Sequence, residues 1–315
     1  MFKRNPYMIS SFFSKARPIH FVVVTLLLLV AFTYTKAVYV KQVIDVLFIF
    51  KQILLFGVCV LSIFVFDFIS GKNDLTKNNS YKILFFSLFM VLMPQTFLNS
   101  KLLVANLFIL FALRRIISIR SKKQINKKVF DAAFWISLAS LLSFWSSLFY
   151  ILIFAALLLY AVADVKNWII PFIGVLTVGV ITVSFLVLTH TDVLGYFSSI
   201  NTTVSFDFSM LNSPQIVLSS TVILSYFAWA VIFYVLNIKS KSKSYKPSYL
   251  LVLLAALIAI VILVIVPQKT GAEFLFLFAP LSIIMANYVE IISEKWFQEI
   301  LIWLLMLVPI INLML

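Results

Sequence analysis

The residues best suited to chemistry in this chain are a few charged side chains that interrupt long apolar runs. Asp45 is the only acid in the segment 36–51, which reads KAVYVKQVIDVLFIFK. A carboxylate beside a substrate cavity can accept a proton from an acceptor hydroxyl, so Asp45 is the candidate catalytic base. Apolar and polar residues alternate along the same segment. This pattern also fits a helix that lies on the membrane surface and leaves Asp45 solvated.

A second group of candidates would bind a phosphate or a substrate outside the membrane. Lys269 is an isolated lysine in the segment 267–273, and Glu273 ends that segment. A lone lysine beside a membrane cavity suits a lipid-linked phosphate, with Glu273 as a positioning group. The two residues are four apart, so on a helix they could instead form an ion pair with each other. His190 and Asp192 are further candidates for substrate contact, in the segment 190–214, whose composition suits a mobile lid or a plain loop.

The strongest charge feature is the run ALRRIISIRSKKQINKKVFD, residues 112–131. Its Arg114, Arg115 and Arg120 are candidate contacts for phosphate, because the guanidinium fork matches phosphate oxygens well. The alternative is that the run only holds a loop against anionic lipid headgroups, at about 1 kcal/mol per basic residue near the surface.

The composition excludes several classes of protein for this chain. The chain has 315 residues, of which 63% are hydrophobic and 11% charged, and this excludes both a soluble globule and a disordered chain. The net charge of +14 would suit nucleic acid, but no soluble domain could present the charges to it. The only cysteine is Cys59 and the only histidines are His20 and His190, so neither a metal site nor another cofactor is expected.

Membrane-spanning helices must therefore position the candidate residues, and the chain is expected to form a single transmembrane domain, 1–315. About 20 apolar residues cross a bilayer, so seven runs predict single spans. These runs are 19–35, 52–66, 168–189, 215–236, 249–266, 274–289 and 300–315.

Two longer apolar stretches, 83–113 and 132–163, could each be one tilted helix or a hairpin of two short helices. Cytoplasmic loops are rich in Lys and Arg, and only two crossings in each stretch keep the basic segments 71–82, 114–128 and 239–246 on one side. The turns are then expected at 94–101 and 143–147. Arms of about 16 residues reach about 24 Å, less than the hydrocarbon thickness of about 30 Å.

The resulting prediction is an all-α polytopic bundle of about 11 transmembrane helices, including two short helical hairpins. The N-terminus is cytoplasmic and the C-terminus periplasmic, with external loops at 36–51, 190–214 and 267–273. About 20 of the 25 Lys and Arg residues then lie inside. The excess of Lys, Ile, Phe and Asn is typical of an AT-rich genome, which favours the inner membrane of a bacterium.

Two stretches resemble a known class of enzyme. LFFSLFMVLMPQTFLNSKLLVANLFILFAL (84–113) and DAAFWISLASLLSFWSSLFYILIFAALLLYAVA (131–163) resemble membrane hairpins of the GT-C glycosyltransferases, polytopic enzymes that use polyprenyl-phosphate sugars. In PQKTGAEFLFLFAPL, Lys269 and Glu273-Phe274 resemble, with a shifted gap, a motif of the mannosyltransferase members. The chain departs from the class in the first external loop, where members carry paired acids and this chain has Asp45 alone.

The whole chain also resembles an uncharacterised family of flavobacterial inner-membrane proteins, through NDLTKNNSY (73–81), ALRRIISIRS (112–121) and FDAAFWI (130–136).

Two functions of different class are favoured by the sequence over a third, a flippase or carrier of lipid-linked material. The GT-C resemblance implies transfer of a sugar from a polyprenyl-phosphate carrier at the outer face, with Asp45 as base and Lys269 on the phosphate. The alternative is a non-catalytic membrane subunit of a secretion, translocation or envelope-assembly complex. The expected partners are membrane lipids in both cases, with a polyprenyl-linked sugar in the first and other inner-membrane proteins in the second.

Overall fold

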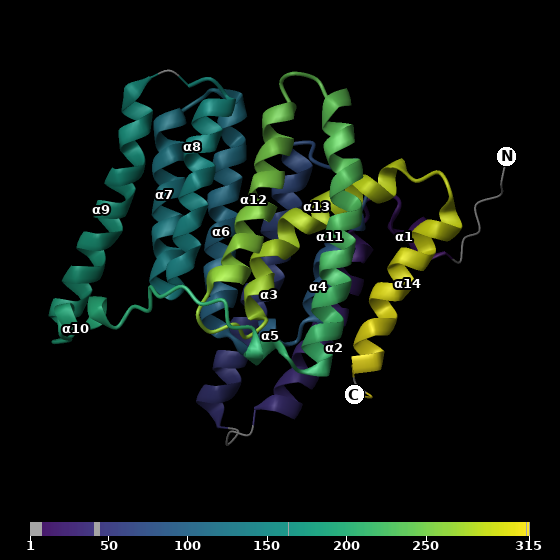
Figure 1. Ribbon diagram of the computed structural model, residues 1–315, viewed down its shortest axis with the longest axis horizontal. Helices are drawn as coiled ribbons and strands as arrows, with labels where there is room; N and C mark the ends of the chain where they lie inside the picture. Colours follow the sequence, from purple (N-terminus) through teal and green to yellow (C-terminus); the bar gives the residue numbers. More distant parts are fainter. Residues whose placement is uncertain (1–7, 41–44, 163, 313, 315) are drawn as a thin grey trace.

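The computed structural model describes residues 8–40, 45–162, 164–312 and 314, and all regular structure in these residues is helical (Figure 1). The all-α prediction is therefore confirmed. The helices are α1 (Ile9–Phe13), α2 (Pro18–Tyr39), α3 (Val46–Lys72), α4 (Tyr81–Leu92), α5 (Gln95–Leu98), α6 (Ser100–Ser118), η1 (Ile119–Ser121), α7 (Ile125–Leu142), η2 (Phe144–Phe149), α8 (Tyr150–Leu159), α9 (Val165–Leu188), α10 (Val193–Ser198), η3 (Ser209–Leu211), α11 (Pro214–Ser240), α12 (Lys246–Ile265), η4 (Ala272–Phe274), α13 (Leu275–Ile291) and α14 (Lys295–Asn312).

Eight of the described helical segments are long and apolar enough to cross a membrane, which is the architecture of a multi-pass membrane protein. They are α2, α3, α6 with η1, α9, α11, α12, α13 with η4, and α14. Two further apolar helices, 81–92 and 144–159, are shorter.

The centre of the bundle is formed by α4 and α13. Nearly every residue of both helices is buried, and the two pack on each other. Apart from a few polar residues, their sequences are apolar on every face, which is the pattern of a helix enclosed by other helices. On one side α6, α7 and α9 form a row, with α9 at the edge of the molecule (Figure 1).

The chain turns at both places where hairpins are predicted. α4 ends at Leu92 before Pro94, and Asn99 starts α6 by accepting the N–H of Leu102 at 3.1 Å. α7 ends at Leu142, and the extended Ser143 leads into η2 and α8. α4 has only 12 residues, so it is shorter than a full span of about 20.

The surface helix predicted over 36–51 is wrong for the described part of that segment. α2 continues to Tyr39 and α3 begins at Val46, so the two spanning helices run into the segment from both sides, and 41–44 lie outside the described residues. The reason is local: Asp45 caps α3, and the apolar residues after it extend that helix.

The basic segments gather at one end of the bundle, which we call the basic end. The guanidinium of Arg120 donates to the carbonyl of Asn73 at 3.3 Å and lies 4.2 Å from the ring of Tyr245. The hydroxyl of Tyr245 in turn donates to Asp74 at 3.1 Å. The segments 71–82, 114–128 and 239–246 therefore meet there, while 93–99, 190–213 and 266–273 lie at the opposite end (Figure 1).

Candidate functional site

At the end of the bundle opposite the basic end, Asp45 is the N-cap residue of α3. Its Oδ1 accepts the N–H of Phe48 at 2.7 Å, and the residue is exposed. A side chain that accepts one of the free N–H groups of a first turn is an N-cap, a role that Asp and Asn share equally. The carboxylate is held by its own helix.

His190 and Asp192 lie at the ends of helices and are both exposed. His190 follows α9 in the left-handed conformation, with φ of 52°. Asp192 caps α10 by accepting the N–H groups of Leu194 at 3.1 Å and Gly195 at 3.0 Å. α10 lies under α9 at the edge of the bundle, so the structure does not bring these two residues to Lys269 (Figure 1).

Lys269 is buried, with 2% of its surface exposed, and it clamps the long loop to the bundle. Its Nζ donates to the carbonyl oxygens of Ser205 at 2.5 Å and Val266 at 2.9 Å, and it lies 4.6 Å from the ring of Phe208. The ion pair with Glu273 that the spacing allowed is not formed among the described residues. This lysine is occupied by main-chain acceptors.

Glu273 also serves the local turn. Its carboxylate accepts the backbone N–H of Thr270 at 3.1 Å and the Thr270 hydroxyl at 2.9 Å. Gly271 follows with φ of 86°, a conformation that glycine adopts at no steric cost, and this shapes the turn before η4. The predicted external residues therefore form three separate local structures instead of one site.

The basic end contains a different kind of feature, a cavity of about 310 Å³ that we call the basic pocket. It lies between the end of α3, the end of α6 and the start of α7. Basic side chains from all three helices converge on it. Its lining residues are Phe68, Lys72, Asn73, Arg114, Arg115, Ser118, Arg120, Ser121 and Lys128.

The turn between α6 and α7 builds this pocket. Lys122 and Gln124 both adopt the left-handed conformation, with φ of 53° and 50°. The chain therefore reverses within a few residues, and the first turn of α7 returns to the last turn of α6. Lys128 closes the turn, since its Nζ donates to the carbonyl of Ser118 and to the hydroxyl of Ser121, both at 2.6 Å.

The positive charge of the basic pocket is only partly balanced. Arg115 pairs with Asp131 at 2.8 Å, the one ion pair that its basic residues make in the described structure. Burial, followed by the positive charges of Arg115 and Lys72, lowers the pKa of Lys128. Because several cations line one cavity and Asp131 is the one acid paired with them in the described structure, an anion bound there would gain favourable electrostatic energy. The predicted contacts Arg114, Arg115 and Arg120 all line this pocket.

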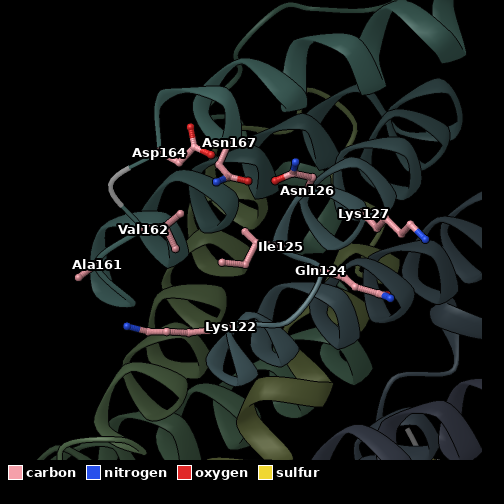
Figure 2. Close-up of a pocket in the computed structure, with 9 residues that line it drawn as sticks. All are labelled: Lys122, Gln124, Ile125, Asn126, Lys127, Ala161, Val162, Asp164 and Asn167. Carbon is pink, nitrogen blue, oxygen red and sulfur yellow. The ribbon is translucent and has the colours of Figure 1, made fainter.

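A larger and more open hollow of about 600 Å³ lies beside the start of α7 and the α8–α9 connection (Figure 2). Its side chains converge only in part: the amides of Asn126 and Asn167 face each other, whereas Gln124 and Lys127 point away from them (Figure 2). Asp164 caps α9 by accepting the N–H of Lys166 at 3.0 Å. This arrangement is weaker than the basic pocket as a binding site for a charged ligand.

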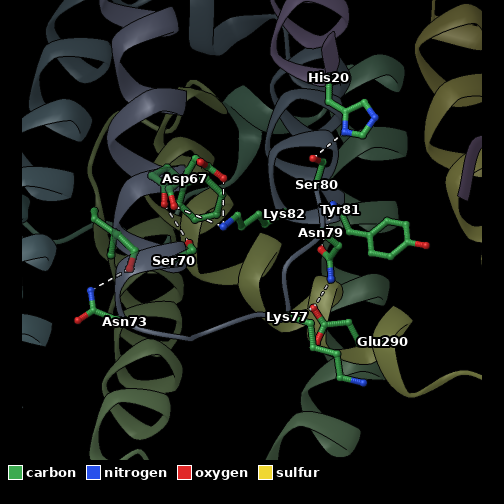
Figure 3. A network of polar contacts seen from close by, with 12 residues as sticks. His20, Asp67, Ser70, Asn73, Lys77, Asn79, Ser80, Tyr81, Lys82 and Glu290 are labelled. Atoms are coloured by element: carbon green, nitrogen blue, oxygen red, sulfur yellow. Dashed lines mark hydrogen bonds and ion pairs between the residues drawn. The ribbon is translucent and has the colours of Figure 1, made fainter. Parts of the chain in front are cut away.

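Next to the basic pocket, a buried polar network holds the segment 73–81 in the end of the bundle (Figure 3). Glu290 accepts the N–H of Lys77 at 2.8 Å and the amide of Asn79 at 2.6 Å. Asn287 donates to the carbonyl of Leu75 at 2.7 Å, which supplies a partner for an amide that is 1% exposed.

Two further contacts complete this network (Figure 3). His20 Nδ1 lies 2.7 Å from the hydroxyl of Ser80, and Lys82 pairs with Asp67 at 3.0 Å. These long-range partners could not be identified from the sequence alone. The available local signal was the clustering of Asn73, Asn78 and Asn79 near acids at the ends of apolar runs.

Comparison with known proteins gives one match. A family model described as a family of unknown function, DUF6427, matches residues 8–314, nearly the whole chain. No curated protein and no solved structure matches the chain. The family description names no glycosyl transfer.

Proposed function

The chain belongs to DUF6427, a family of unknown function, and from the geometry of its site we propose that it is a non-catalytic membrane protein that binds a phosphate-bearing ligand in the basic pocket. The observation that carries the proposal is the convergence of basic side chains from three helices on one cavity of about 310 Å³. Phosphate oxygens accept charge-assisted hydrogen bonds, which are roughly twice as strong as neutral ones.

The topology we propose puts the basic pocket on the cytoplasmic side of a bacterial inner membrane. Helices α4 and 144–159 count as short crossings in this scheme, which gives about 11 in total, with the N-terminus inside and the C-terminus outside. The gathering of the segments 71–82, 114–128 and 239–246 at one end supports it, because Lys and Arg concentrate in cytoplasmic loops.

The local roles of the external charged residues support a non-catalytic protein. Asp45 and Asp192 cap helices, Glu273 closes a turn, and Lys269 holds carbonyl oxygens. Each would have to leave its present partner before it could act on a substrate. A membrane subunit of an envelope or translocation complex, with other inner-membrane proteins as partners, needs none of these changes.

Arg114 and Lys72 give the sharpest test of ligand binding. Both side chains lie over the ring of Phe68, at 4.8 Å and 5.2 Å, and neither side chain makes a hydrogen bond in the described structure. We expect Arg114→Gln/Lys72→Gln to fold normally and to lose at least about tenfold in retention of phosphate-bearing adducts, since each charge-assisted bond contributes about 1.5–3 kcal/mol. Native mass spectrometry of the protein in mild detergent measures this.

The matched control is Lys239→Gln/Lys243→Gln, which removes the same number of charges from the same end of the bundle but outside the pocket. If both double variants lose the adduct equally, the attraction is general surface charge. The basic pocket would then have no binding role.

A second candidate function is the sugar transfer implied by the GT-C resemblance. Support for it comes from the stretches 84–113 and 131–163 that resemble GT-C hairpins, because the helices in them break at 93–99 and 143–149. The variant Asp45→Asn distinguishes a role of Asp45 as catalytic base from its role as the N-cap of α3. Asn caps a helix as well as Asp does, so melting temperature should stay unchanged, while an enzyme would lose its base. Unchanged transfer from a polyprenyl-phosphate sugar by reconstituted protein would exclude Asp45 from catalysis.

A further inference from the structure

We propose that the basic pocket is the headgroup site of an anionic glycerophospholipid, one of whose acyl chains lies along α3 in the adjoining apolar groove. This inference rests on the proposed binding of a phosphate-bearing ligand and names its class. The groove has a volume of about 210 Å³ and is lined by Phe64, Val65, Phe68 and Arg114. Phe68 and Arg114 also line the basic pocket, so the two spaces share a wall.

The spacing along α3 matches the shape of a lipid. Phe64, Phe68 and Lys72 follow one another at intervals of four, so they lie on one face of the helix. With a rise of 1.5 Å per residue, about 12 Å separates Phe64 from Lys72. These side chains would accommodate a ligand with an apolar part beside Phe64 and an anionic part beside Lys72. The long axis of that ligand would run parallel to α3. A membrane phospholipid has this order of groups.

The groove is on the surface that the bilayer covers. Phe64 is 51% and Phe68 42% exposed in the protein alone, and α3 is one of the helices long and apolar enough to cross a membrane. An exposed apolar surface of this kind is best covered by the acyl chains of lipids. A soluble phosphate compound would occupy the basic pocket and leave the groove without contacts. Arg114 stacks on Phe68 at the boundary, which places a guanidinium where the ester and phosphate region begins.

The charge of the pocket selects among headgroups. Lys72, Arg114, Arg115, Arg120 and Lys128 line it, and the acid Asp131 is engaged with Arg115. An ammonium-bearing zwitterionic headgroup would bring a further cation into this cluster. An anionic headgroup without an amine adds only acceptors, so the geometry favours it.

The experiment compares three probes on the detergent-purified full chain: dioleoyl phosphatidylglycerol, dioleoyl phosphatidylcholine and sn-glycerol 3-phosphate. Binding is followed by native mass spectrometry and by the shift in melting temperature. We expect phosphatidylglycerol to bind the wild-type protein at least about tenfold more tightly than phosphatidylcholine, a difference of about 1.4 kcal/mol. Glycerol 3-phosphate is expected to bind much more weakly than either lipid.

The groove is tested by Val65→Phe, which fills it with a ring. Displacing about two methylene groups should weaken phosphatidylglycerol about tenfold and leave glycerol 3-phosphate unchanged. Leu61→Phe is the matched control, because Leu61 is on α3 and 45% exposed but outside the groove. An unchanged melting temperature of unliganded Val65→Phe shows that the helix still packs.

The outcomes separate the two proposals. If glycerol 3-phosphate binds as well as phosphatidylglycerol and Val65→Phe changes neither, the pocket binds phosphate but the lipid inference is wrong. If no phosphate probe binds, or if Arg114→Gln/Lys72→Gln binds all of them as the wild type does, the proposed function itself fails. Equal binding of phosphatidylcholine and phosphatidylglycerol would overturn the selection for an anionic headgroup.

Discussion

Replacing Asp67 with leucine is expected to lower the free energy of unfolding by about 3–5 kcal/mol, because it strands a buried ammonium. The Nζ of Lys82 lies 3.0 Å from Asp67 Oδ1, and the Lys82 side chain is 6% exposed. Its other contact is the carbonyl oxygen of Asp67 at 3.4 Å, a long hydrogen bond. Once the carboxylate is gone, this long bond is the one contact among the described residues that still offsets the cost of keeping the charge away from water.

The two halves of this ion pair should behave differently. The Asp67 side chain is 32% exposed, so in Lys82→Met the remaining carboxylate can reach solvent or headgroups. We therefore expect Lys82→Met to cost clearly less than Asp67→Leu. The double variant Asp67→Leu/Lys82→Met should recover most of the loss, because an apolar pair of similar volume is often neutral in such a position.

Unfolding in mixed micelles, followed by tryptophan fluorescence, measures these differences. Asp131→Leu is the control, because it breaks the exposed pair with Arg115, whose side chains are 39% and 31% exposed. Exposed pairs contribute about 0–1 kcal/mol. A cost for Asp67→Leu no greater than that of Asp131→Leu would show that Lys82 finds water or another acceptor.

This ion pair also illustrates which features could be predicted from the sequence. Each charged residue was visible near the end of an apolar run, and the helices break at both places where the positive-inside rule required a second crossing. Arg114, Arg115 and Arg120 were grouped as candidates because they are neighbours in the chain, and the structure places all three around one pocket. Basic residues that are neighbours in a short loop remain neighbours in the folded protein, so a cluster of this kind can be predicted from the sequence.

Contacts over long separations could not be found in this way. Asn79 and Glu290 are separated by 211 residues, and periodicity within a helix says nothing about which distant segment will face it. The sequence predicts that Lys269 contacts a phosphate, but in the structure its acceptors are the carbonyl oxygens of Ser205 and Val266. Every residue has a carbonyl, so a lysine that will bind main chain looks the same in a sequence as one that will bind a ligand.

Gly174→Ala is expected to destabilise the packing of α9 on α7, although alanine is the better helix former. A Cβ at residue 174 would lie 2.6 Å from the Cβ of Ala133 and 3.2 Å from the backbone N of Phe134. Neither atom can turn aside, because one is a methyl fixed to the main chain and the other is the main chain itself. α9 must therefore move away from α7. Overpacking of this kind costs about 1–3 kcal/mol, more than the gain of about 1 kcal/mol in helix propensity.

The matched control is on the same helix. A Cβ at Gly179 meets nothing within 4 Å, so Gly179→Ala should leave stability unchanged or raise it by about 0.4–1 kcal/mol. Thermal unfolding in detergent gives the sign for each variant. Cleavage of the exposed segment 199–208 by a protease reports whether α9 has loosened, since that segment follows α9 and α10. Ala133→Gly in the Gly174→Ala background removes the closest clash and should restore part of the stability. Small residues let membrane helices approach closely where no hydrophobic force between them operates, so a failure of Gly174→Ala to destabilise would mean that α9 is held by its connections instead of by this contact.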